Sequence, residues 1–115
     1  MKRKKRPASQ SEAMRLKWKR RIVFEKGYTK SCAEWMAERL EALLDHMQYG
    51  HAAVAYRKQN GSFQLAKATL IYYEAEFHRE YDPTEVEGAV VYWNVDEQRW
   101  TTFQVENFME WRPIV

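Results

Sequence analysis

Apolar residues recur at helical spacing in the first part of the chain and alternate in the second part. Met14, Trp18 and Ile22 recur every four residues and predict a helix over residues 10–26. The sequence SQSE at residues 9–12 has the spacing of a capping box, in which serine and glutamate satisfy free backbone donors at a helix start. The apolar stripe is narrow, so basic side chains surround most of this helix.

A second, more strongly amphipathic helix is predicted over residues 31–48. The sequence SCAE at residues 31–34 forms a second capping box, and Cys32 extends the apolar stripe by one turn. We therefore expect Cys32 to be a buried, inert thiol. The stripe itself consists of Met36, Leu40, Leu43, Leu44 and Met47.

From His51 onward the period changes from helical to two. Residues 51–57 and 63–71 flank Asn60-Gly61, a dipeptide that strongly favours a tight hairpin. A second hairpin is predicted from residues 88–95 and 99–105, followed by a short helical step and a last strand near Trp111. The acidic segment 74–87 is predicted either as a continuing strand with a long loop or as a mobile lid.

Five short strands in so small a sheet expose two edges unless the sheet curls. We therefore predict an α+β protein in which two helices pack on a small, closed or partly closed barrel. The segments are a disordered basic tail (1–8), a two-helix segment (9–50) and the barrel (51–115). The predicted barrel core consists of Val54, Tyr56, Leu65, Leu70, Val91, Trp93, Phe103, Val105 and Phe108.

Composition limits the class of protein. A chain of 115 residues with 45% hydrophobic residues fits one globular domain. Cys32 is the single cysteine, which excludes an intramolecular disulfide and favours a reducing compartment. No apolar run is long enough to cross a bilayer, and the basic N-terminus lacks the apolar segment of a signal peptide. We expect a cytoplasmic protein.

Charge is distributed unevenly along the chain. Residues 1–30 carry a formal charge of +10, whereas residues 31–115 carry −7. A basic arm on an acidic body either meets a polyanion or folds back onto the body. If it binds DNA or RNA, its basic side chains would contact phosphates, with Trp18 as a surface for base stacking. The candidate residues are Lys2, Arg3, Lys4, Lys5, Arg6, Arg15, Trp18, Lys19, Arg20 and Arg21.

The sequence contains no constellation typical of catalysis. His46, His51 and His78 lack the spacing of metal ligands, and no phosphate-binding loop or nucleophile motif is present. We therefore predict no catalytic residues, no metal and no cofactor. Several aromatic side chains remain as candidates for a surface that binds a protein partner. They are Tyr73, Phe77, Tyr81 and Trp100.

The second half of the chain resembles a family of small Sm-like or SH3-like β-barrel proteins. The resemblance covers about residues 52–110 and rests on the Asn-Gly hairpin, Tyr92-Trp93, the acidic turn Asp96-Glu97, WTTF at 100–103 and ENF at 106–108. This family occurs in gut bacteria and their phages, is largely uncharacterised and is related to the WYL domain. The resemblance implies a five-stranded SH3/Sm-like barrel and a regulatory, ligand-sensing role, in some relatives associated with nucleic acids.

Two departures from the WYL pattern bear on function. The chain lacks a clear Trp-Tyr-Leu triplet, and residues 51–115 carry a net charge of −4, which disfavours phosphate binding by the barrel itself. We therefore predict a non-enzymatic binding or regulatory adaptor that contacts nucleic acid through its basic N-terminal arm and first helix. The alternative is a protein-interaction module without a nucleic-acid role, and a third hypothesis is a phage or mobile-element protein that binds a host enzyme. DNA or RNA preference and oligomeric state stay open.

Overall fold

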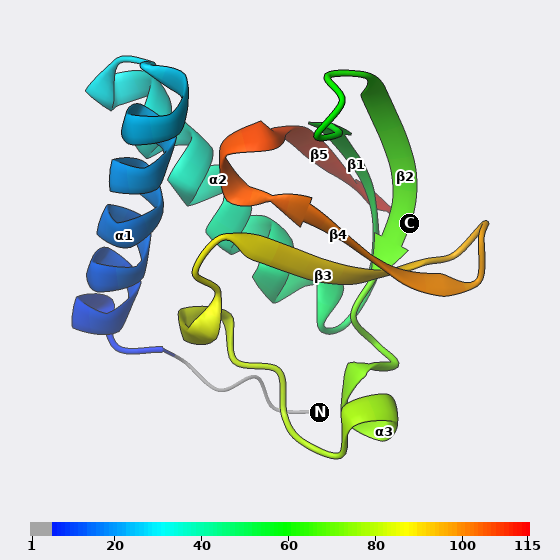
Figure 1. Cartoon of the computed structure of the whole chain (residues 1–115). Coiled ribbons are helices and arrows are strands. Elements are labelled where there is room, and N and C mark those ends of the chain that lie inside the picture. Colours follow the sequence, from blue (N-terminus) through cyan, green and yellow to red (C-terminus); the bar gives the residue numbers. More distant parts are fainter. Residues whose placement is uncertain (1–5) are drawn as a thin grey trace.

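The computed structural model describes residues 6–115, and the first five residues lie outside the described part. Two long helices precede five strands, and short helical turns lie between the strands (Figure 1). The helices are α1 (Ala8–Lys26), α2 (Lys30–Met47) and α3 (Tyr73–Phe77), with 3-10 turns η1 (Pro83–Glu85) and η2 (Val105–Asn107). The strands are β1 (His51–Arg57), β2 (Phe63–Thr69), β3 (Ala89–Asn94), β4 (Arg99–Gln104) and β5 (Phe108–Ile114).

The five strands form one antiparallel, strongly curled sheet in the order β4-β3-β2-β1-β5. Strands β2 and β3 pair only at Ala68↔Asn94 and Thr69↔Trp93, so the β3–β4 hairpin diverges from β2 after a short contact. The turn of this hairpin points away from α1 and α2 (Figure 1). The predicted α+β fold of two helices and a five-stranded sheet is confirmed, although β4 and β5 do not close the barrel.

The helix boundaries differ from the predicted capping boxes. Helix α1 begins at Ala8 after Pro7, which places Ser9 inside the first turn rather than at the cap. Helix α2 is capped by Thr29, whose hydroxyl oxygen accepts a hydrogen bond from the Cys32 backbone N–H at 3.2 Å. Proline suits a helix start because it has no backbone N–H to leave unpaired, and threonine suits a cap because its hydroxyl accepts a free donor.

Cys32 is exposed, which corrects the prediction of a buried thiol. It lies in the first turn of α2, where the buried stripe is continued by Ala33 instead. Ala33 stands three and four residues before Met36 and Ala37, the spacing that keeps side chains on one helix face.

Residues 74–87, for which the sequence predicted a strand or a lid, form two short helical turns joined by loop. Helix α3 ends at Phe77 and is followed by His78, which adopts a left-handed conformation (φ 59°). Further along, the Asp82 side chain accepts a hydrogen bond from the Thr84 backbone N–H at 3.0 Å and caps η1. The segment is therefore ordered by local capping rather than by pairing into the sheet.

Three members of the predicted barrel core lie outside it. Leu65 is exposed, and Val91 and Trp93 are only partly buried, whereas Val90 and Tyr92 are fully buried. The cause is strand parity, because successive side chains of a strand point to opposite faces. The other six predicted core residues are buried: Val54, Tyr56, Leu70, Phe103, Val105 and Phe108.

An aromatic cluster fills the inside of the curled sheet. The hydroxyl groups of Tyr56 and Tyr92 hydrogen-bond at 2.6 Å, and the Tyr56 ring stacks on Phe103 at a centroid distance of 4.8 Å. Burial and the hydrogen bond with Tyr56 raise the pKa of the Tyr92 hydroxyl above its usual range. The pair satisfies the polar atoms that the rings carry into the core.

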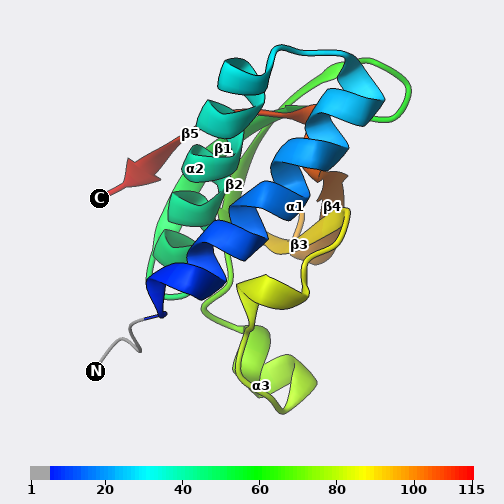
Figure 2. The same ribbon diagram turned by 90° about the vertical axis from the view of Figure 1, so that its left-hand side faces the viewer.

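Helix α1 lies alongside α2 and in front of the strands (Figure 2). Its buried residues are the predicted stripe Met14, Trp18 and Ile22. Trp18 is fully buried, and its indole N–H donates a hydrogen bond to the Val86 carbonyl oxygen at 2.9 Å. This bond connects the first helix to the segment that leads into β3.

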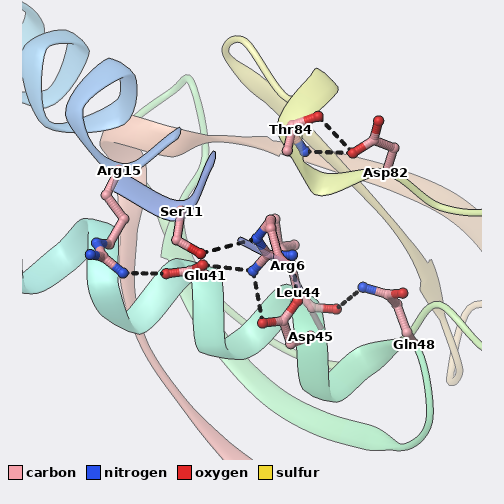
Figure 3. Close-up of polar contacts among 9 residues, drawn as sticks. All are labelled: Arg6, Ser11, Arg15, Glu41, Leu44, Asp45, Gln48, Asp82 and Thr84. Atoms are coloured by element: carbon pink, nitrogen blue, oxygen red, sulfur yellow. Dashed lines mark hydrogen bonds and ion pairs between the residues drawn. The ribbon is translucent and has the colours of Figure 1, made fainter. Parts of the chain in front are cut away.

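Arg6 and Arg15 tie the start of α1 to α2 through one carboxylate (Figure 3). Arg6 donates to Glu41 at 2.6 Å and to Asp45 at 3.0 Å, and Arg15 donates to the other Glu41 oxygen at 2.8 Å. Burial alone would raise the pKa of Glu41, but hydrogen bonds with Arg6, Ser11 and Arg15 outweigh it and hold that pKa below its ordinary value. The carboxylate is therefore favoured in its charged form.

Replacing Trp18 should show how strongly α1 depends on this contact. We expect Trp18→Ala to lower the free energy of unfolding by about 3–5 kcal/mol, because it leaves a cavity and an unpaired Val86 carbonyl. The control Trp35→Ala removes a half-exposed ring of α2 and should cost about 1 kcal/mol or less. Urea unfolding followed by circular dichroism measures both, and equal destabilisation by the two variants would contradict the assigned burial of Trp18.

The Glu41 network should make stability depend on acidity. Because the pKa of Glu41 is lowered in the folded state, its contribution is present above the ordinary glutamate pKa and is lost as pH falls through the lowered value. We expect Glu41→Gln to cost about 1–3 kcal/mol at pH 7 and progressively less in acid. Denaturant midpoints from pH 7 to pH 3 test this, with exposed Glu38→Gln as the matched control. A Glu41→Gln deficit that stays constant over this range would contradict it.

Candidate functional site

Most of the described basic residues that were predicted to contact nucleic acid bind acidic side chains of the chain itself. Lys2, Arg3, Lys4 and Lys5 lie outside the described residues, and Arg6 and Arg15 bind Glu41 as above. Lys19 forms a longer ion pair with Glu34 at 3.4 Å. In the described part of the chain, Arg20 is exposed and has no ion-pair partner.

Arg21 is bound by side chains of β4 and η2 and is only partly exposed. Its Nε donates to Glu106 at 2.7 Å, and a second nitrogen donates to the Gln104 side-chain oxygen at 3.2 Å. The hydrogen bond with Glu106 raises the pKa of Arg21, and Glu106 is itself buried in η2. The Arg21 guanidinium also packs against Gly88, just before β3. Binding a phosphate would disrupt these structural contacts.

Trp18 does not offer a surface for base stacking, because its ring is fully buried between α1 and the sheet. The sequence placed it correctly on the apolar stripe, and that position removes it from the predicted nucleic-acid contacts. Stacking needs an accessible ring face. The buried stripe of α1 therefore provides no accessible aromatic ring beside the basic side chains of the first thirty residues.

The aromatic residues predicted for a partner surface do gather in one place. Helix α3 carries Tyr73 and Phe77, and both rings lie against Trp100 of β4, with centroid distances of 6.1 and 5.1 Å. Tyr81 packs edge-on against Tyr73 at 5.0 Å. Phe77 is exposed, whereas Tyr73 is buried and Tyr81 and Trp100 are partly buried, so the Phe77 ring is presented and the others support it.

Two polar atoms within this cluster have no hydrogen-bond partner among the described residues: the Tyr81 hydroxyl and the Trp100 indole nitrogen. Burial, reinforced by the neighbouring Tyr73 and Asp82, raises the pKa of Tyr81 well above its usual range. The Tyr81 hydroxyl therefore remains protonated near neutral pH. The cluster therefore contains neutral rings whose two unpaired donors are buried, and no titrating base.

A shallow hollow of ≈ 300 Å³ adjoins Trp100 on the outer face of the β3–β4 hairpin. Its walls include the rings of Tyr72 and Trp93, with Trp93 facing Tyr72 at 6.0 Å and Trp100 at 5.4 Å. The lining residues are Tyr72, Glu76, Trp93, Val95, Gln98 and Trp100.

Sequence reasoning missed Tyr72, Glu76 and Trp93 as members of this surface. The signal for Trp93 is the hairpin register: Trp93 pairs directly with Trp100, and Val90 pairs with the buried Phe103. Since Trp93 lies an odd number of residues from Val90, it belongs to the opposite face. For Tyr72 and Glu76 no comparable signal exists, because their position depends on the path of the loop after β2.

The described residues hold no group of three or more His, Cys, Asp or Glu side chains arranged to bind a metal ion. Across residues 6–115, each helix is too short or too polar to span a membrane. The described residues instead present aromatic faces, carboxylates and basic side chains, most of the latter paired and Arg20 without an ion-pair partner.

Comparison with known proteins identifies the end of α2 and most of the sheet. A family model described as WYL_2, with an Sm-like SH3 β-barrel fold, matches residues 40–109, which is more than half of the chain. Curated proteins and solved structures give no match. The fold in this description typically serves non-catalytic binding. On the strength of this family match, which spans β1 to β4 and the first two residues of β5, the chain belongs to the WYL_2 family of Sm-like SH3 β-barrel proteins.

Proposed function

We propose that the protein is a non-enzymatic adaptor that binds a protein partner through the outer face of the β3–β4 hairpin and α3. The observation that carries this proposal is the joining of Tyr72, Phe77, Trp93 and Trp100 in one accessible aromatic surface with a hollow beside it. We call these four residues the hairpin surface. Exposed aromatic patches of this kind mark interaction sites on soluble domains.

The hairpin surface has the properties of an interface centre. Its rings have few rotatable bonds, so they lose little conformational entropy when a partner covers them. Tyr72 is 50% exposed and Phe77 44% exposed, which leaves apolar area to be buried on binding. Trp and Tyr are also the residue types that most often contribute large shares of binding energy. Supporting rings behind Trp100 hold the surface in one arrangement.

Nucleic-acid binding is the second candidate, carried by the formal charge of +10 on residues 1–30. The exposed Arg20, together with Lys26 and Lys30, remains available on the described part of this segment. Arg6, Arg15 and Arg21 already bind carboxylates. Phosphate contacts by those three would have to replace existing charge-assisted hydrogen bonds, so the first proposal has the stronger support.

A comparative capture experiment tests the first candidate. Immobilised wild-type protein and Trp35→Ala, which alters an exposed ring of α2, should recover the same stoichiometric partner from nuclease-treated extract. Trp93→Ala and Tyr72→Ala should recover at least tenfold less, consistent with the 2 kcal/mol or more typical of aromatic hot spots (about thirtyfold). A partner retained equally by all four proteins would contradict a role for the hairpin surface.

A salt titration tests the second candidate. Binding of mixed-sequence DNA and RNA is measured by fluorescence anisotropy at about 50 and 200 mM salt, a range over which the affinity of phosphate-binding proteins falls strongly. If the basic arm binds phosphates, affinity falls steeply with salt, and removing residues 1–5 reduces the slope by nearly one for each phosphate that those residues neutralise. Undetectable binding at the lower salt concentration would reject nucleic-acid binding.

A further inference from the structure

We propose that the hollow beside Trp93 receives an arginine side chain presented by the protein partner. This proposal rests on the proposed function and names the chemistry that the hairpin surface would recognise. It follows from three properties of the hollow: the angles between its aromatic walls, an uncompensated carboxylate at its rim, and its size.

The aromatic walls meet at steep angles rather than stacking on one another. The Tyr72 and Trp93 ring planes differ by 74°, and those of Trp93 and Trp100 by 69°. Rings at these angles form the sides of a corner and leave the space between them open. A cation within about 6 Å of a ring centroid is attracted by the negative face of the ring, most strongly by tryptophan. Two tryptophans and a tyrosine around one hollow therefore favour a cationic occupant.

Glu76 supplies negative charge at the hollow. Glu76 is one of the residues that line the hollow, and within the described part of the chain it forms no ion pair. The neighbouring Glu97 differs, because Arg99 binds it at 2.7 Å. A cation entering the hollow would gain Glu76 as a new partner and would not displace an existing one from the described residues.

Arginine fits these groups better than lysine does. Its planar guanidinium stacks on aromatic faces, is weakly hydrated and presents parallel N–H donors to a carboxylate. The Gln98 side chain also lines the hollow, and its amide oxygen can accept a further hydrogen bond. A volume of ≈ 300 Å³ lies at the lower end of ligand sites, so the hollow has room for an entire arginine side chain but not for a large cofactor.

Nuclear magnetic resonance of the full chain can test this chemistry directly. The probes are the peptides acetyl-Gly-Arg-Gly-amide, its citrulline counterpart and its lysine counterpart, at constant ionic strength. The indole N–H signals of Trp93 and Trp100, assigned with Trp→Phe variants, report occupancy of the hollow. We expect saturable shifts with the arginine peptide in the millimolar range and binding several-fold weaker with neutral citrulline, which corresponds to removing one cation–π interaction of about 0.5–1 kcal/mol.

Variants separate binding from folding. Glu76→Gln changes an exposed side chain of α3 and should leave the urea midpoint unaltered. It should weaken binding of the arginine peptide a few-fold, in line with one exposed ion pair of about 0.2–1 kcal/mol. Glu38→Gln on α2 is the matched control and should leave affinity unchanged. Absence of saturable shifts, equal binding of citrulline or equal binding of lysine would overturn the proposal. If the peptide results overturn the proposal while Trp93→Ala still fails to capture the protein partner, the proposed function stands and only the arginine assignment is wrong.

Discussion

The two faces of β3 divide the aromatic residues of this protein between its core and its surface. Val90 and Tyr92 point inward, where Tyr92 hydrogen-bonds Tyr56, while Trp93 points outward and pairs with Trp100. A shift of one residue in the β3–β4 register would exchange these sets, because the side-chain period of a strand is two. The core could not then satisfy its tyrosine hydroxyls, and the hollow would not form. One structural constraint thus determines both stability and the candidate site.

Part of the basic charge on residues 6–30 is neutralised by carboxylates of the same chain. Basic residues near and within α1 meet carboxylates from α2 and η2, as in Arg6–Glu41 and Arg21–Glu106. These partly buried, hydrogen-bonded pairs differ from isolated surface ion pairs, which contribute little. A basic sequence segment can therefore be explained by intramolecular complementarity before an external polyanion is invoked. The contacts of Arg6 and α1 agree with a basic segment that packs on the acidic body, whereas residues 1–5 lie outside the described part of the chain.

Sequence patterns predicted the helices, the hairpins and the order of elements because each rests on local spacing. The stripe Met14, Trp18 and Ile22 is one example, and Asn60-Gly61 is another, with Gly61 at φ 87°. The same reasoning failed on β3, where residues 90–93 are all apolar or aromatic and alternation gives no contrast between faces.

Long-range pairing decides what local spacing cannot. On β2 the core face is formed by Ala66 and Ala68, opposite Val54 and Ala52, so the larger Leu65 is left outside. Hydrophobicity alone ranks these residues in the wrong order, since Leu is more often fully buried than Ala. Glu76 and Tyr72 join the candidate site only through the path of the chain after β2, for which the sequence contains no periodic signal.

The Trp93–Trp100 pair also has a purely structural explanation. The residues at α3 distinguish this explanation from recognition of a partner. A cross-strand aromatic pair stabilises a hairpin, and this hairpin needs support because β3 contacts β2 over two residue pairs. That role explains two tryptophans on the outer face, but it requires neither Tyr72 nor Glu76, which stand outside the strands. That structural role does not require an exposed glutamate that lines the hollow with three aromatic residues and forms no ion pair to the described residues. Its presence at the hollow favours recognition of a cation over reinforcement of the turn.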